Sequence, residues 1–163
     1  MPLPKPHRAA RNGLLLGAAV IVADQATKLA VLHSLQLWER VAVIPGLFNL
    51  VHFRNRGAAF GLLDSPELAW QNGFLIGVTC LALCLILYML LASRKRDVWF
   101  CLGLGAILGG AVGNLVDRLR LGMVIDYLDF YLGSLHWPAF NLADTAISLG
   151  AVTVLITCFT GKE

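Results

Sequence analysis

Gly73–Ala92 reads GFLIGVTCLALCLILYMLLA, a stretch without a single charged side chain. A transmembrane helix needs about 20 consecutive, mainly apolar residues to cross the hydrocarbon core of a bilayer. The stretch therefore predicts a membrane-spanning helix, and it makes the neighbouring apolar segments candidates for further spans.

The composition agrees with a membrane protein. The chain has 163 residues, of which 58% are hydrophobic and 14% are charged, whereas a soluble domain is about 45–50% apolar and about 25% charged. These values exclude an ordinary soluble globule and a disordered chain. The net charge of +3 is too small to attract a polyanion, so no nucleic-acid partner is expected. The length suits one domain, residues 1–163.

Three more segments, 13–32, 98–116 and 140–159, are long and apolar enough to span a membrane. Residues 33–72 and 117–139 then form two loops on one side. The first segment resembles a signal peptide, but no small-residue cleavage site follows it, which favours a retained helix. The sequence thus predicts an all-α integral membrane protein with four transmembrane helices.

Basic residues predict the orientation of the spans. Seven of the 13 Lys and Arg fall on one side, namely Lys5, Arg8, Arg11, Arg94, Lys95, Arg96 and Lys162. Because short cytoplasmic loops carry the excess of basic residues, both termini are expected in the cytoplasm. Loops 33–72 and 117–139 are then expected on the outer, periplasmic side.

The first outer loop has its own secondary-structure signals. Val41–Ile44 and Leu47–Phe53 are β-prone runs separated by the turn signal Pro45-Gly46. Ser65-Pro66-Glu67 fits the start of a helix. We expect a small β-rich outer subdomain and a short surface helix lying against the outer leaflet.

Several polar residues fall inside the spans, where each needs a physical reason. Asp24 and Lys28 lie four apart in the first span, the spacing and order of a helical ion pair. They either lock this helix into the bundle or act directly at a site. Gly105, Gly109 and Gly113 form a stripe that favours close helix packing.

The outer ends of the third and fourth spans collect polar side chains at one level. Asn114, Asp117 and Arg118 share one helix face, and Asn141 and Asp144 share another. The four cysteines, Cys80, Cys84, Cys101 and Cys158, lie in apolar runs, so neither a disulfide framework nor a zinc site is expected. No metal or other cofactor is predicted.

Carboxylates are the reactive groups that these segments supply. Two carboxyl groups held close together share a proton, so that one activates water while the other protonates a carbonyl oxygen. A single Asp is equally explained as a helix cap or a salt-bridge partner, as for Asp117 beside Arg118. That explanation is weaker for Asp126 and Asp144, since Asp144 lies in the membrane without an adjacent base in the sequence.

The chain closely resembles the lipoprotein signal peptidases (signal peptidase II), the aspartyl proteases of the bacterial inner membrane. The matching segments occur in the family's order: DQATK at 24–28, NRGAAFG at 55–61, GGAVGNLVDR at 109–118, VIDY at 124–127 and WPAFNLAD at 137–144. Together these five motifs are far more specific than any one of them alone.

The resemblance implies a catalytic pair of Asp126 and Asp144. It also implies that certain side chains bind the substrate or support the site: Asn55, Asn114, Arg118, Asn141, Asp24 and Lys28. Asp117 is assigned structural support. The implied substrate is a diacylglyceryl-modified prolipoprotein, cleaved just before its lipobox cysteine near the outer leaflet, by a monomeric enzyme that contacts membrane lipid.

Two other classes of function are weighed against this one. A proton-coupled carrier would explain Asp24, Lys28 and Asp144 inside the spans, but the chain has no internal repeat, which many carriers have. A structural subunit that packs through the span-three glycines would leave the convergent acids unexplained.

Overall fold

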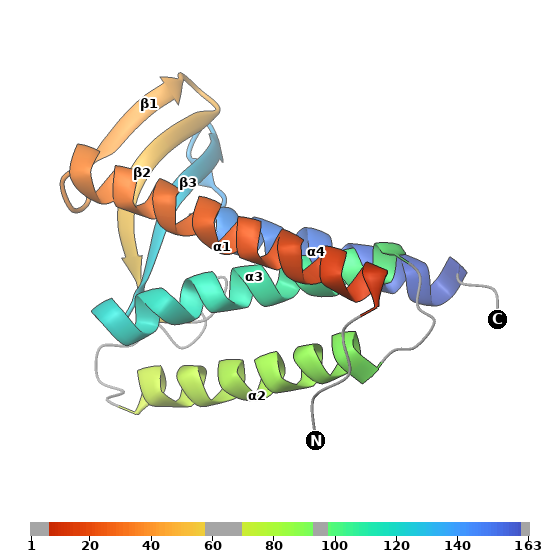
Figure 1. Cartoon of the computed structure of the whole chain (residues 1–163). Helices are drawn as coiled ribbons and strands as arrows, with labels where there is room; N and C mark the ends of the chain where they lie inside the picture. The colour runs from red at the N-terminus through yellow and green to blue at the C-terminus, as the bar shows by residue number, and fades with distance from the viewer. Residues whose placement is uncertain (1–6, 58–69, 93–97, 161–163) are drawn as a thin grey trace.

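The structure is a computed structural model that describes residues 7–57, 70–92 and 98–160. It contains α1 (Arg8–Ser34), α2 (Gln71–Ala92), α3 (Val98–Leu121) and α4 (Leu142–Thr160). These four helices are long and apolar enough to cross a membrane. They lie alongside one another, and a small sheet projects from the end of the bundle opposite the start of α1 and the end of α4 (Figure 1).

The sheet combines strands from both predicted outer loops. β1 (Arg40–Ile44) and β2 (Phe48–Asn55) come from the first loop, and β3 (Val124–Leu132) and β4 (Leu135–His136) from the second. All neighbours are antiparallel, in the order β1-β2-β3-β4. The predicted four helices and β-rich subdomain are confirmed, whereas the expected surface helix near Ser65 lies outside the described residues.

Two features of the second loop differ from the expectation. α3 continues through Leu121 instead of ending at Val116, so Asp117 and Arg118 are helical. The residues from Val124 onward form a strand that was not expected from the sequence. In the register of this strand, Asp126 lies opposite Phe53 of β2.

Glycines set the packing of the bundle, with α3 between α1 and α4. A Cβ on Gly105 would collide with the backbone of Gly13 in α1, and a Cβ on Gly109 would lie 2.5 Å from the carbonyl oxygen of Gly17. On the side of α4, a Cβ on Gly110 would collide with the carbonyl oxygen of Ala143. The predicted stripe is therefore a packing feature that brings three backbones into contact.

A hydrophobic cluster fixes the sheet on the bundle. Its buried members are Val31 of α1 together with Ile125 and Tyr127 of β3, and Leu142 of α4 packs against them. Ile125 and Tyr127 flank Asp126 in the sequence and point to the face opposite it, because side chains alternate along a strand. Burial of these two neighbours therefore holds Asp126 toward the other face.

Candidate active site

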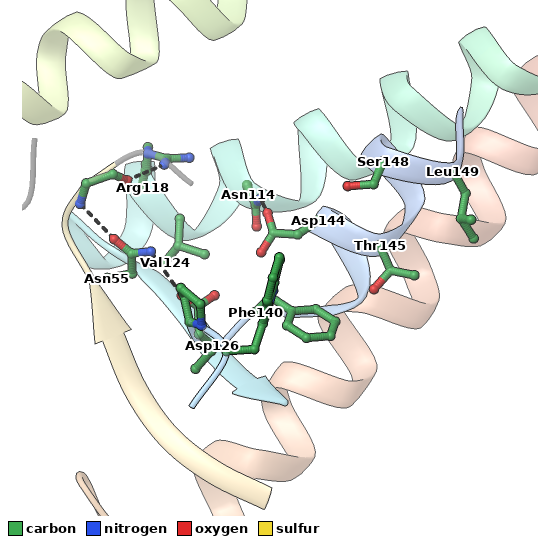
Figure 2. A pocket seen from close by; sticks show the side chains of 14 residues that line it. Asn55, Asn114, Arg118, Val124, Asp126, Phe140, Asp144, Thr145, Ser148 and Leu149 are labelled. Atoms are coloured by element: carbon green, nitrogen blue, oxygen red, sulfur yellow. Dashed lines mark hydrogen bonds between the residues drawn. The ribbon is translucent and has the colours of Figure 1, made fainter. Parts of the chain in front are cut away.

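Asp126 and Asp144 line one cavity of about 310 Å³ between the sheet, α3 and α4 (Figure 2). Asp126 is the third residue of β3, and Asp144 is the third residue of α4. The cavity is lined by Asn55, Gly57, Asn114, Arg118, Val124, Asp126, Trp137, Pro138, Ala139, Phe140, Asp144, Thr145, Ser148 and Leu149.

Asn141 contacts both acids. Its side-chain Nδ2 donates to Oδ1 of Asp126 at 2.8 Å, and its backbone N–H donates to Oδ2 of Asp144 at 3.2 Å. Its Oδ1 in turn accepts from the backbone N–H of Asp144 at 2.9 Å. The exchange between Asn141 and Asp144 is a capping box at the start of α4. Because Asn141 is fully buried, this single residue fixes the position of each carboxyl group relative to the other.

Two further amides hold the carboxyl groups from the other elements. Asn55, at the end of β2, donates to Oδ2 of Asp126 at 3.0 Å, and Asn114 of α3 donates to Oδ1 of Asp144 at 2.8 Å. Asn55 also accepts from the backbone N–H of Gly57 through its Oδ1 at 2.8 Å, which orients its amide. The two aspartates are thus held by three asparagines from β2, α3 and the start of α4.

Asp24 and Lys28 form the expected ion pair, at 2.9 Å, and both are almost completely buried. Neither lines the cavity. Lys28 Nζ instead contacts Oδ2 of Asp117 at 2.8 Å and donates to Oδ1 of Asn114 at 2.9 Å. Since Asn114 donates to Asp144, Lys28 reaches that acid through one intervening amide.

Asp117 supports the fold around the site. Its partner is Lys28 rather than its neighbour Arg118, and it also accepts the backbone N–H of Ile125 at 3.2 Å. Gln25, whose role the sequence did not reveal, bridges Asp24, Asp117 and the carbonyl oxygen of Gly113. Two of its three partners, Gly113 and Asp117, lie far away in the sequence, so only the structure identifies this bridge.

Arg118 extends from α3 to the wall of the cavity. Its Nη2 donates to the carbonyl oxygen of Gly57 at 3.0 Å. Its Nε is buried and has no hydrogen-bond partner among the residues that the structure describes. A buried guanidinium N–H without an acceptor is costly, which makes this group a candidate to bind a carbonyl oxygen of a ligand.

The pKa of Asp126 is far from that of an exposed aspartate. Burial of the carboxyl group, with a smaller contribution from the charge of Asp144, raises its pKa from 3.8 to about 7. Hydrogen bonds from Asn55 and Asn141 oppose this shift without cancelling it. At neutral pH Asp126 therefore retains a proton far more often than an exposed aspartate does, as an acid in a shared-proton pair should.

Asp129 lies on the same strand but belongs to a different cluster. It accepts from Asn49 at 2.8 Å and contacts Nδ1 of His136 at 2.8 Å. Burial alone would raise its pKa, but these two hydrogen bonds, together with the charges of His136 and Arg40, outweigh burial and lower it. Asp129 does not line the cavity, and it holds the strands of the sheet together. Among the described residues, no group of three or more His, Cys, Asp or Glu could hold a metal ion.

Comparison with known proteins points to one family. The family model described as signal peptidase (SPase) II matches residues 16–160. The chain is 47% identical to a lipoprotein signal peptidase from Maridesulfovibrio salexigens over 91% of its length and 95% of that protein. It is 46% identical to one from Syntrophus aciditrophicus, over 88% of this chain and 89% of that protein.

The fold has close counterparts among solved structures. A bacterial membrane enzyme determined at 2.3 Å resolution superposes with a TM-score of 0.82, at 26% identity, over 93% of this chain and 92% of that one. A second, at 1.9 Å resolution, gives a TM-score of 0.81 at 24% identity, over 99% of this chain and 100% of the other.

Proposed function

The chain belongs to the signal peptidase II family, and from this premise we propose that Asp126 and Asp144 hydrolyse the peptide bond before the diacylglyceryl cysteine of prolipoproteins. The observation that carries the proposal is the contact of Asn141 with both carboxyl groups at one cavity. Family membership itself identifies a membrane aspartic peptidase that removes lipoprotein signal peptides.

In the first step of the proposed mechanism, Asp144 is ionised and Asp126 carries the shared proton. Asp144 accepts a proton from water as the water oxygen attacks the scissile carbonyl carbon. Asp126 donates its proton to the carbonyl oxygen, so that a neutral gem-diol forms. No covalent bond to the enzyme is made.

In the second step the tetrahedral intermediate collapses. Asp144, now protonated, donates to the leaving amide nitrogen, and the C–N bond breaks. Asp126 takes back a proton from one hydroxyl of the gem-diol, and the oxygen of that hydroxyl becomes the carbonyl oxygen of the carboxyl product. The pair then returns to its starting state with one proton shared, and water has been consumed.

Substrate contacts are assigned to the walls of the cavity. The Nε of Arg118, which has no hydrogen-bond partner among the described residues, is suited to a carbonyl oxygen of the signal peptide near the scissile bond. Thr145, Ser148 and Leu149 continue the cavity along α4 (Figure 2), away from the sheet. We assign this direction to the acyl chains of the lipidated cysteine, since their burial against apolar side chains provides affinity.

We further place the site near the outer leaflet of the bacterial inner membrane, with both termini in the cytoplasm. The support is the excess of basic residues before and at the start of α1 and between α2 and α3. A signal peptide that enters from the cytoplasm would present its cleavage site at that level.

Cleavage of a purified diacylglyceryl precursor, followed by gel mobility, tests the proposal. Asp126→Asn and Asp144→Asn should each abolish cleavage, whereas Asp129→Asn, a buried acid of the same strand outside the cavity, should retain it. A chelator should leave the wild-type rate unchanged. Near-normal cleavage by either of the first two variants would refute the catalytic pair. Asp144-dependent ion flux without cleavage would favour a carrier instead.

A further inference from the structure

The start of α4 is held by side chains from several other elements. The backbone N–H groups of the cap residue Asn141 and of the first three residues of α4 each donate to a side-chain oxygen: Asn141 to Asp144, Leu142 to Tyr127, Ala143 to Asp24, and Asp144 to Asn141. Such groups have no partner within their own helix. The position of Asp144 therefore depends on these four acceptors.

Tyr127 is the acceptor that links this helix to the strand of Asp126. Its hydroxyl oxygen accepts the N–H of Leu142 at 3.2 Å, and the hydroxyl donates to Oγ1 of Thr27 in α1 at 2.9 Å. The hydroxyl of Thr27 in turn lies 2.9 Å from the carbonyl oxygens of Ala23 and Asp24. One continuous chain of hydrogen bonds thus joins α4, β3 and α1.

The backbone of Tyr127 strengthens the same junction. Its N–H donates to the carbonyl oxygen of Phe140 at 3.0 Å, and Leu128 N–H donates to that oxygen at 2.9 Å. The ring is 6% exposed and packs with Val31 and Ile125. With the ring fixed by burial and the backbone fixed by these bonds, the hydroxyl has a defined position.

Given the proposed acid pair, we infer that the Tyr127 hydroxyl is a positioning group, which holds Asp144 at its working separation from Asp126 by fixing the first turn of α4 to β3 and α1. Tyr127 directly follows Asp126, and Leu142 lies two residues before Asp144. The hydrogen bond between the Tyr127 hydroxyl and Leu142 N–H therefore joins the two chain segments that carry the acids, close to each acid. It touches neither acid, so it acts through the backbone.

Tyr127→Phe removes only the hydroxyl, and Tyr131→Phe is its matched control. Tyr131 lies on the same strand and accepts the N–H of Gly46 at 2.8 Å, so the control loses one hydrogen bond at the β1–β2 turn, whereas Tyr127→Phe loses the two bonds to Leu142 and Thr27. We expect Tyr127→Phe to lower kcat for a diacylglyceryl precursor roughly three- to tenfold. KM should stay within about twofold of the wild type, since no substrate contact is lost.

The pH dependence of kcat distinguishes positioning from a general loss of stability. A wider separation and better hydration of the pair would lower the pKa of Asp126 toward its ordinary value, because burial and the charge of Asp144 are what raise it. The alkaline limb of the kcat profile should therefore move to lower pH in Tyr127→Phe and not in Tyr131→Phe.

Thr27→Val completes a double-mutant cycle. If Thr27 and Tyr127 act through one bond, the double variant should be no slower than the slower single variant. Additive losses in kcat would overturn the inference, as would a Tyr127→Phe variant with the kcat and pH profile of the wild type. The variants are measured beside Asp126→Asn, which should be inactive. If Asp126→Asn cleaves the precursor, the proposed acid pair is refuted, and this result is distinct from a failure of the inference about Tyr127.

Hydrogen exchange of the Leu142 amide tests the contact independently of activity. Exchange should be faster in Tyr127→Phe than in Tyr131→Phe or the wild type. Equal exchange in all three proteins overturns the inference, and this result does not depend on the substrate or on the proposed acid pair.

Discussion

Asp126 retains a proton at a pH where an exposed aspartate has lost it, and this single residue sets the expected pH range of the reaction. Burial first, and then the charge of Asp144, raise its pKa to about 7. As the pH rises through this value, Asp126 ionises and the proton for the carbonyl oxygen is lost. We expect kcat to fall above about pH 7, measured as initial cleavage rates at saturating precursor. A rate that stays constant well into the alkaline range would contradict this assignment.

Lys28 is the second residue with a large expected effect. Its ammonium group contacts both Asp24 and Asp117, which are buried. Lys28→Met leaves two carboxyl groups buried without a cation, and loss of one partner of a buried ion pair costs about 3–5 kcal/mol. Thermal unfolding in detergent should show a large decrease in Tm. Arg11→Met, an exposed position on the same helix, should leave Tm almost unchanged, and equal effects would refute the role of Lys28.

Among the helices, the glycines of α3 determine whether Asp126 and Asp144 lie close together. A Cβ on Gly110 would collide with the carbonyl oxygen of Ala143, which belongs to the same turn as Asp144. Gly110→Ala should therefore push the start of α4 away from α3 and reduce both Tm and cleavage, the latter by more than about tenfold.

Gly77→Ala in α2 is the control for this substitution. Apart from the local backbone of α2 itself, no atom of the described residues lies within 4 Å of a Cβ placed there, and alanine favours a helix over glycine by about 1 kcal/mol. Gly77→Ala should thus leave cleavage unchanged and Tm unchanged or slightly higher. A Gly110→Ala variant as active as Gly77→Ala would show that the helices can separate without harm.

The helices and strands also differ in how well the sequence predicts them. Long apolar runs predict the helices because the period and length of a span are local properties. β3 was not predicted because it contains Asp126 and Asp129. Aspartate is depleted in strands, so these residues indicated a loop. Gln25 and the hydroxyl of Tyr127 could not be assigned, since their partners lie on other elements and no local pattern encodes that contact.

The whole molecule has its sheet at one end of the bundle, opposite the start of α1 (Figure 1). With the expected orientation, Ser134 between β3 and β4 faces the periplasm, and Arg11 near the start of α1 faces the cytoplasm; both are exposed. Ser134→Cys should react with a membrane-impermeant maleimide in intact spheroplasts, and Arg11→Cys only after lysis. The native cysteines lie in the helices, and the wild type corrects for their labelling. The opposite pattern would invert the topology.

The anchoring of the first turn of α4 has a consequence for biosynthesis. Asp24 of α1 and Tyr127 of β3 each accept a backbone N–H of this turn, and both precede α4 in the chain. They therefore leave the ribosome before α4, and until α4 is made these two acceptors lack their backbone donors. Synthesis of α4 supplies both the missing backbone donors and the second acid. Asp126 and Asp144 can therefore come together only after α4 has been made and has packed against α1 and β3, which links formation of the acid pair to the insertion of this helix.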